Sequence, residues 1–529
     1  MQTLIKQRLA PLLKNGSVNT LKTLQRGIEK ESLRIDKLGK LAQTPHPKTL
    51  GSSLTHPNIT TDFSESLLEL ITPVFTNIDA TLEHLDTTHR YIYSQLENES
   101  LWPASMPCAL PNDPDIPVAR YGSSNVAKMK TTYRIGLGNR YGRTMQTIAG
   151  IHYNFSIPSQ LWPQLQALAS DEDKALSEQA FVSKAYFRLI RNFRRISWLL
   201  VYLYGASPAV CKTFLRDREH QLEVFDDHSF YLPYATALRM GDLGYQSNAQ
   251  NRLNICYNSL DSYISTLKQE ITTPHTDYQS IGIKNAKGDY QQLSDALLQI
   301  ENEFYSTIRP KHVTQSGEIP LGALQNRGVE YIEIRCLDVN PYLPLGIDAD
   351  QIRFIDCLLL FCLFDDSPLC DGDDRFRIDA NFKRVVNEGR KPGLELDQRQ
   401  GKISLVEWSE QLLDGIDVIA KQLDQLHGGN GYSEVSKAQR AKIHDSSLTP
   451  SAQILADMNV KQRSFGQFAL GCAKAHDQYF RGRPLSDAEQ QAFIATCTLS
   501  QQQQADIEAA DDIDFDTYLS HYFSQYEQL

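Results

Sequence analysis

Five segments of the chain alternate polar and apolar residues with a period of two, which is typical of strands that bury one face. They are residues 26–35, 62–73, 151–157, 299–305 and 331–338. In the first segment this alternation places Glu29 and Glu31 on one face, about 7 Å apart, beside Leu33 and Ile35. Two carboxylates that close repel each other unless a cation lies between them or one holds a proton. Alone, the pair indicates an exposed acidic edge, but the other segments repeat the pattern and predict a sheet face that binds cations and phosphates.

Residues 62–73 allow two interpretations. Alternation places Glu65, Leu67, Glu69 and Ile71 on one face, and Pro73 would end the strand. A helix competes with this, because Asp62 followed three residues later by Glu65 forms a capping pattern. We favour the strand, since the segment is short and is closed by a proline.

The remaining pattern mixes helices with strands. Helical spacing is found near the N-terminus, ending at Gly16, and over residues 79–100, 171–204 and most of the chain after 350, with breaks at 365–374 and 426–432. Residues 133–157 are predicted to begin as a glycine-punctuated loop and to end as a strand. Strands interleaved with helices without a regular βαβ rhythm predict an α+β fold, in which one face of an antiparallel sheet lines a cavity and helices cover the other.

Composition narrows the function classes. The 529 residues carry a net charge of −11 and no long run of Lys or Arg, so a nucleic-acid partner is not expected. The longest apolar run, 357–364, is too short to span a membrane, and the N-terminus lacks the pattern of a secretory signal. Nine scattered cysteines without metal-ligand spacing suit a reducing cytoplasm. We expect a catalytic region over 1–365 and a mainly helical C-terminal region over 366–529.

The polar face of the predicted sheet offers a set of groups suited to metal and phosphate chemistry. It comprises Glu29, Glu31, Asp62, Glu69, His152, Asn154, Glu333 and Arg335. Several carboxylates with one imidazole suit two or three Mg²⁺ ions, whereas zinc would prefer a cluster of thiolates and histidines. A lone histidine more often has a structural role than a functional one. The position of His152 in an alternating strand makes a structural role and a metal-ligand role about equally favoured.

The phosphate-binding groups are less well specified. Arg335 follows Glu333 by two residues, so the two side chains form either a surface ion pair or a metal ligand beside a phosphate-binding guanidinium. Arg309 and Lys311 are weaker candidates for nucleotide contacts. The sequence contains no GxxxxGK[ST] loop, no GxGxxG after a strand and no GxSxG elbow. Phosphoryl transfer here would therefore depend on metals and arginines.

Seven segments together resemble the proteobacterial type of glutamate–cysteine ligase, also called γ-glutamylcysteine synthetase. They are RGIEKESLR (26–34), LTHPNITTDFSESLLELITPV (54–74), YGRTMQTIAGIHYNFS (141–156), YLPYATALRMGDLGY (231–245), IENEFYSTIRPK (300–311), GVEYIEIRCLDVNP (328–341) and EGRKPGL (388–394). The resemblance implies a glutamine-synthetase-like fold, with a curved antiparallel sheet forming an active-site funnel. It also implies that ATP and Mg²⁺, for which Mn²⁺ can substitute, join the γ-carboxylate of L-glutamate to the amine of L-cysteine through a γ-glutamyl phosphate.

The same resemblance implies a role for individual residues. The metal ligands would be Glu29, Glu31, Asp62, Glu69, His152 and Glu333, and the cysteine pocket would be Phe63, Tyr133, Leu137, Gln146, Tyr245 and Tyr305. Arg335 would meet the ATP phosphates, with Arg309 and Lys311 as further nucleotide contacts. Arg239 would bind the glutamate α-carboxylate with Asn154 nearby, and Arg134 and Glu69 would join Arg335 as catalytic groups.

Two other functions remain open at this point. One is the same acyl-phosphate chemistry with a different amine acceptor, which an aromatic pocket does not exclude. The other is a non-catalytic metal-binding protein, which the complete set of six ligands disfavours. We expect a monomer acting on small molecules.

Overall fold

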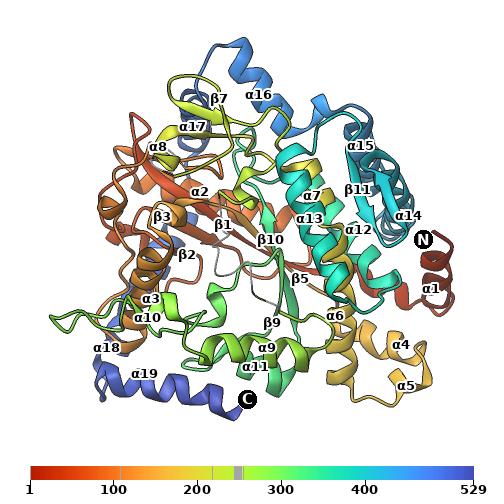
Figure 1. The fold of residues 1–529 in the computed structure, drawn as a ribbon, viewed down its shortest axis with the longest axis horizontal. Helices are drawn as coiled ribbons and strands as arrows, with labels where there is room; N and C mark the ends of the chain where they lie inside the picture. The colour runs from red at the N-terminus through yellow and green to blue at the C-terminus, as the bar shows by residue number, and fades with distance from the viewer. Residues whose placement is uncertain (1, 108, 217, 244–252, 254) are drawn as a thin grey trace.

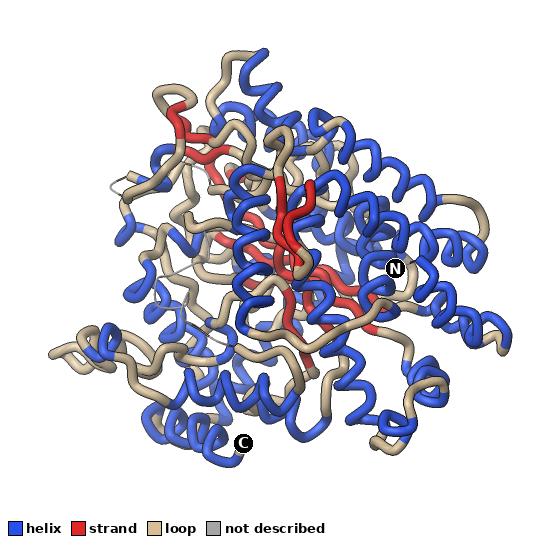
Figure 2. Tube along the Cα trace, turned by 45° about the vertical axis from the view of Figure 1, so that its right-hand side comes forward, coloured by secondary structure: helices blue, strands red, loops and turns tan. Residues whose placement is uncertain are grey.

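One antiparallel sheet runs through the middle of the molecule, and helices surround it (Figures 1 and 2). The computed structural model describes residues 2–107, 109–216, 218–243, 253 and 255–529. The strand order is β2 (Ile59–Thr61), β3 (Leu67–Ile71), β1 (Gln25–Asp36), β5 (Ile151–Ser156), β10 (Tyr331–Leu337) and β9 (Ile308–Lys311), and β4 (Glu99–Leu101) also pairs with β1. All of these pairs are antiparallel. The predicted α+β class is confirmed.

The strand register brings the polar residues of separate segments onto one face. Glu29 of β1 lies opposite His152 of β5, and Glu31 of β1 lies opposite Glu69 of β3. Glu333 of β10 lies opposite Asn154 of β5. Because side chains at directly paired positions project to the same face, these groups form a continuous polar surface on four neighbouring strands.

The other face of the sheet is apolar and is covered by helices. Ile28, Tyr153 and Ile334 are all fully buried there. They belong to a cluster that includes α2 (Ile78–Gln95), α6 (Glu178–Ile196), α7 (Trp198–Tyr204) and α12 (Ala349–Phe364). α12 contains the apolar run 357–364 and is buried around most of its circumference, which explains why no amphipathic stripe marks it in the sequence.

A buried ion pair connects α12 to the sheet. The Arg26 guanidinium of β1 donates to both Asp356 oxygens, with Nη2–Oδ2 at 2.6 Å, and the Tyr153 hydroxyl donates to Asp356 Oδ1 at 2.8 Å. Arg26 and Asp356 are 1% and 0% exposed. The group therefore fixes β1 and β5 close to Glu29 and His152.

Replacing Asp356 with asparagine is expected to destabilise the fold by about 3–5 kcal/mol, because it leaves the buried Arg26 charge without its counter-ion. Denaturant unfolding of the variant measures this. The control is Asp350→Asn, which breaks the exposed Arg353–Asp350 pair on the same helix and should cost less than about 1 kcal/mol. Equal losses in the two variants would contradict the structural role of the buried pair.

The remaining helices pack around this core. They are α1 (Gln2–Lys14), α3 (Asn125–Tyr141), α4 (Trp162–Ala167), α5 (Asp171–Lys174), α8 (Lys212–Leu215), α9 (Leu260–Thr272), α10 (Thr276–Gln279), α11 (Pro320–Arg327), α13 (Gly372–Glu388), α14 (Leu405–His427), α15 (Gly431–His444), α16 (Pro450–Val460), α17 (Phe465–Arg481), α18 (Asp487–Ala510) and α19 (Phe515–Ser524). Both large hydrophobic clusters include residues from before and after residue 365. The boundary at 365 between a catalytic region and a C-terminal region stays a prediction. Within the described residues, no helix is both long and apolar enough to cross a membrane.

Two small sheets complete the fold. Strands β6 (Ala209–Cys211), β8 (Ser229–Tyr231) and β7 (Glu223–Val224) form one, and the hairpin of β11 (Glu395–Gln398) and β12 (Gly401–Ser404) forms the other. The prediction of mainly helical structure after 350 is confirmed, but it did not include this hairpin.

Three local predictions were wrong. Residues 133–141 belong to helix α3, not to a loop. Residues 301–303 form a 3₁₀ turn, so the strand expected over 299–305 is found only at Ile308–Lys311. The strand expected over 62–73 begins at Leu67, and Glu65 is turned away from Glu69 to accept hydrogen bonds from the backbone amides of His46 and Arg120.

Candidate active site

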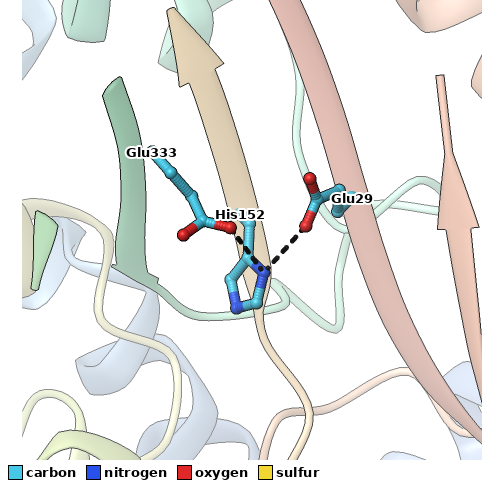
Figure 3. Close-up of side chains that lie close together, drawn as sticks. All are labelled: Glu29, His152 and Glu333. Atoms are coloured by element: carbon cyan, nitrogen blue, oxygen red, sulfur yellow. Dashed lines mark hydrogen bonds and ion pairs between the residues drawn. The ribbon is translucent and has the colours of Figure 1, made fainter. Parts of the chain in front are cut away.

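Glu29, His152 and Glu333 converge from three adjacent strands (Figure 3). His152 Nδ1 donates to Glu29 Oε2 at 3.1 Å and lies 3.8 Å from Glu333 Oε1. One ligand atom from each residue lies within 4.8 Å of the other two. His152 Nε2 is also 3.7 Å from Glu31 Oε1, so a fourth group of the same face adjoins the cluster.

Two of these carboxylates are held in the charged form. Burial acts to raise the pKa of Glu333, but Lys311 and Arg335 outweigh it and lower that pKa well below its usual value. Lys311 Nζ and Arg335 Nη1 lie 3.7 and 3.1 Å from Glu333 oxygens. For Glu29 burial again raises the pKa and the charge of Glu333 adds to it, but the His152 hydrogen bond together with the charges of His152 and Lys311 outweighs both, so the pKa is lowered.

The next two carboxylates along the face behave in the opposite way. Burial raises the pKa of Glu31 to about 6, and its Oε2 accepts a hydrogen bond from the Gly150 amide at 2.6 Å. Glu69 lies opposite Glu31, and burial together with the charges of Glu29 and Asp62 raises the pKa of Glu69 well above its usual value. The raised pKa values favour the protonated forms of Glu31 and Glu69 when no cation is bound.

The donor groups fit a hard divalent cation. Glu333 Oε2 and Asn154 Oδ1 are buried oxygens that accept no hydrogen bond from the described residues, although Arg335 is at ion-pair distance from the former. Carboxylate oxygens with one imidazole match the ligand preference of Mg²⁺ or Mn²⁺ rather than that of a thiolate-binding metal. A divalent ion here would provide a partner for these two buried oxygens, and its positive charge would offset the negative charge of the carboxylates.

Binding of Mg²⁺ should therefore depend on pH. Without the ion, a proton on Glu31 stabilises the fold, and this contribution disappears as the pH rises through about 6, because the folded-state pKa exceeds the ordinary one. Mg²⁺ must displace that proton, so at a fixed subsaturating concentration it should raise Tm more at about pH 7.5 than at about pH 5.5. Calorimetric scans at both values test this. An equal shift at the two pH values would contradict a carboxylate site of raised pKa.

A cavity of about 350 Å³ opens beside the cluster. Its lining includes His152, Arg335, Arg239 and Tyr305. Arg239 is 1% exposed, donates from Nε to Asp338 Oδ1 at 3.0 Å, and also donates to the carbonyls of Arg335 and Leu337. A Cβ at residue 150 would lie 2.8 Å from Arg239 Nη1, which explains the glycine there.

The residues predicted to form a cysteine pocket come from neighbouring segments. The Tyr305 hydroxyl donates to Gln146 Oε1 at 3.3 Å. Tyr133 and Leu137 lie on α3 together with Arg134, whose Nε donates to the Asp62 carbonyl and whose Nη2 is 3.7 Å from Asp62 Oδ1. This contact holds the 62–63 turn, including the buried Phe63, against α3. Tyr245 lies outside the described residues.

Arg309 is placed differently from Lys311. Its Nη2 donates to the carbonyls of Asn302 and Phe304, and the described residues that line the cavity do not include it. Lys311 reaches Glu333 instead. Asn154 donates from Nδ2 to Glu29 Oε1 at 2.8 Å and so lies next to the cluster.

Sequence reasoning missed the support of the Tyr305 segment. Arg140 Nη1 and the Tyr141 hydroxyl donate to Glu303 Oε1 at 3.0 and 2.6 Å, and the Arg140–Glu303 pair is fully buried. This group fixes the segment before Tyr305 to α3. The sequence signal for this contact is the pair Arg140–Tyr141. Sequence reasoning places this pair in a loop, whereas it lies at the end of helix α3.

Comparison with known proteins agrees with this geometry. The profile of the family described as glutamate-cysteine ligase matches residues 9–385. Glutamate–cysteine ligases of Pseudomonas paraeruginosa and Azotobacter vinelandii are 52% and 49% identical over 522 residues, covering 99% of this chain and 98% of each relative.

Solved structures show the same architecture. A crystal structure of glutamate–cysteine ligase from Francisella tularensis in complex with AMP has a TM-score of 0.90 and 37% identity, covering 96% of this chain and 98% of that one. A bifunctional glutathione synthetase from Pasteurella multocida shares the fold, with a TM-score of 0.71 and 24% identity over 89% of this chain and 55% of that one. By family profile and by identity over almost its whole length, the chain belongs to the glutamate–cysteine ligase family.

Proposed function

We propose that the protein joins the γ-carboxylate of L-glutamate to the amine of L-cysteine, forming γ-glutamylcysteine, ADP and phosphate, the first step of glutathione biosynthesis. The observation that carries this proposal is the Glu29–His152–Glu333 cluster, which borders a cavity containing Arg335 and Arg239. Anionic and cationic groups side by side suit a nucleotide with its metal ions and an amino-acid carboxylate. The reaction takes place in the cytoplasm on small molecules, and the protein acts as a monomer.

The metal ligands we propose are Glu29, Glu31, Asp62, Glu69, His152 and Glu333. Bound there, two or three Mg²⁺ ions, or Mn²⁺ in their place, would neutralise phosphate charge during phosphoryl transfer. His152 is oriented by Glu29, and Asn154 in turn donates to Glu29, so the ligands support one another.

The cations of the site have separate tasks in this proposal. A carboxylate is a poor electrophile toward an amine, and its conversion to a γ-glutamyl phosphate provides a good leaving group. Arg335 meets the charge that develops on the transferring phosphoryl group, with Lys311 beside it. Arg239 fixes the glutamate α-carboxylate and so sets where the γ-carboxylate reaches. Arg309 is a further candidate for a nucleotide contact: its Nη2 donates to the carbonyls of Asn302 and Phe304, and its Nε has no hydrogen-bond partner among the described residues.

The amine acceptor occupies the aromatic pocket in this proposal. That pocket consists of Phe63, Tyr133, Leu137, Gln146 and Tyr305, with Tyr245 as a sixth expected member. Arg134 holds the Asp62–Phe63 turn in place between the pocket and the metal ligands. Glu69 and a phosphate oxygen are the two candidates for accepting the amine proton.

ADP release with glutamate, ATP, Mg²⁺ and a panel of amines tests the proposal. Cysteine should be used at least about tenfold more efficiently than alanine, which lacks only the sulfur. Ammonia and putrescine should be poorer still, and mass spectrometry should identify γ-glutamylcysteine. Equal rates with ammonia, alanine or putrescine would contradict the cysteine assignment and favour another acceptor.

A further inference from the structure

The last helices of the fold contact three segments that carry residues of the aromatic pocket or lead into them. These helices are α18 and α19, and the 3₁₀ turn Gln525–Gln528 follows them. We call residues 487–528 the C-terminal clamp. In Figure 1 it lies at the lower left, and α19 contacts α3. Leu519 and Tyr526 are buried in the large cluster behind the sheet, so the clamp is an integral part of the fold.

The loop before β2 is held by α18. The Ser52 amide donates to Ser500 Oγ at 3.0 Å, and both residues are buried. Next to Ser52 along the chain, the Ser53 carbonyl accepts a hydrogen bond from the Thr60 hydroxyl at 2.6 Å. Thr60 lies on β2, three residues before the buried Phe63 of the aromatic pocket. A contact with α18 is therefore passed through one hydrogen bond to the turn that carries Phe63.

The N-terminus of α3 is held by the linker between α18 and α19. The Asp511 carboxylate accepts a hydrogen bond from the Asn125 amide at 2.5 Å, and the Asn125 side chain donates to the Ile513 carbonyl at 2.9 Å. A negative charge at the N-terminus of a helix also interacts favourably with the helix dipole. Because Tyr133 and Leu137 lie further along the same helix, these contacts fix the part of the pocket that α3 provides.

The 3₁₀ turn of the clamp holds the segment that leads to Tyr305. Tyr526 is fully buried, and its hydroxyl donates to Glu301 Oε2. Glu301 Oε1 accepts a hydrogen bond from the Leu321 amide at 2.9 Å, so both oxygens of this buried carboxylate have partners. Tyr305, four residues after Glu301, lines the main cavity. Tyr526 therefore fixes the start of the segment that places Tyr305.

We propose that the C-terminal clamp positions the aromatic pocket for the amine acceptor, with Ser500, Asp511 and Tyr526 as positioning residues. Each of them contacts a different segment of the pocket, so the clamp sets how Phe63, α3 and Tyr305 lie relative to one another. The inference rests on the proposed function, because it requires the acceptor to bind in this pocket. The positioning residues act through the pocket and not on the reacting atoms.

The groups proposed to bind the metal and glutamate are held from other directions. Glu29, His152 and Glu333 lie on the central strands β1, β5 and β10. Arg239 is fixed by its contact with Asp338 at 3.0 Å. Weakening the clamp should therefore change the binding of the acceptor much more than the binding of ATP.

Initial rates with one substrate varied at a time test this selectivity. Tyr526→Phe removes only the hydroxyl that reaches Glu301, and it should raise KM for cysteine at least about fivefold but KM for ATP less than about twofold. Asp511→Ala should act in the same way through α3, and Asp511→Asn, which keeps an oxygen acceptor, should restore most of the loss. The control is Asp506→Asn, at an exposed residue of α18 that pairs with Gln502 of the same helix. Unchanged KM for cysteine in folded Tyr526→Phe and Asp511→Ala, or an equal rise for ATP, would overturn the proposal.

Hydrogen–deuterium exchange supplies a second readout that needs no turnover. In Tyr526→Phe the peptide covering residues 301–307 should exchange at least about fivefold faster than in the wild type, while peptides from β5 and β10 should exchange as before. Wild-type exchange in residues 301–307 of this variant would overturn the proposal. If the wild type used another amine, the proposed function would fail, but the exchange result would stand and the rise in KM would be found for that amine instead.

Discussion

Replacing Glu333 with glutamine is expected to reduce ADP formation by at least about 10²–10³-fold. Glu333 is 1% exposed, faces His152 across the cluster, and is held in the charged form by Lys311 and Arg335. Glutamine keeps the shape but removes the negative charge that a divalent cation requires. Steady-state assays with glutamate, cysteine and ATP at saturating Mg²⁺ measure the loss.

The matched control is Glu330→Gln, three residues earlier in the chain. Glu330 has a side chain that is 48% exposed and accepts a hydrogen bond from the Val313 amide outside the cluster. Its replacement should leave activity within about twofold of the wild type. Circular dichroism and unfolding midpoints establish that both variants are folded. Near-normal turnover in folded Glu333→Gln would show that the cluster is not where the metal acts.

Replacing Arg335 with methionine is expected to lower kcat/KM for ATP by about 10²-fold or more. The guanidinium lies 3.1 Å from Glu333 and lines the cavity, so it adjoins both the proposed metal ligands and the proposed nucleotide site. Lysine at this position should restore little, because a single ammonium does not reproduce two parallel N–H donors.

Initial rates at varied ATP, with glutamate and cysteine saturating, separate the effect on ATP from effects on the amino acids. Arg353→Met is the control, since Arg353 pairs with an exposed aspartate on α12. We expect the KM values for glutamate and cysteine to change much less than that for ATP. A variant that lost cysteine affinity but kept its kinetics for ATP would show that Arg335 has another role.

The central strands could be predicted because their polarity alternates over several residues. In β5, His152 and Asn154 alternate with the buried Ile151 and Tyr153, which is the signal of a sheet with one polar face. The same pattern identified Glu29 and Glu333 before any register was known. Which strands are neighbours depends on contacts between distant segments, so the alternation predicted a shared polar face but not the register that places Glu29 opposite His152.

Helix α3 shows why local signals can mislead. Gly136 and Gly138 were interpreted as loop glycines, but both lie within the helix. A Cβ at residue 136 would be 2.1 Å from the Gln299 side chain, so the glycine permits close packing rather than a turn. Likewise Glu303 belongs to the alternating segment 299–305, yet it lies in a 3₁₀ turn beside Arg140. Contacts with residues distant in the chain decide the conformation of both segments, and a short stretch of sequence does not contain those residues.

The central claim is that Glu29, His152 and Glu333 bind one divalent cation at the edge of the nucleotide cavity. A crystal of the protein grown with Mn²⁺ and a non-hydrolysable ATP analogue tests it, because anomalous scattering locates the ion independently of the coordinates. The account predicts a Mn²⁺ peak within ligand distance, about 2.0–2.4 Å, of all three side chains and beside the phosphates. A saturated crystal with its Mn²⁺ and phosphates away from these residues would contradict it.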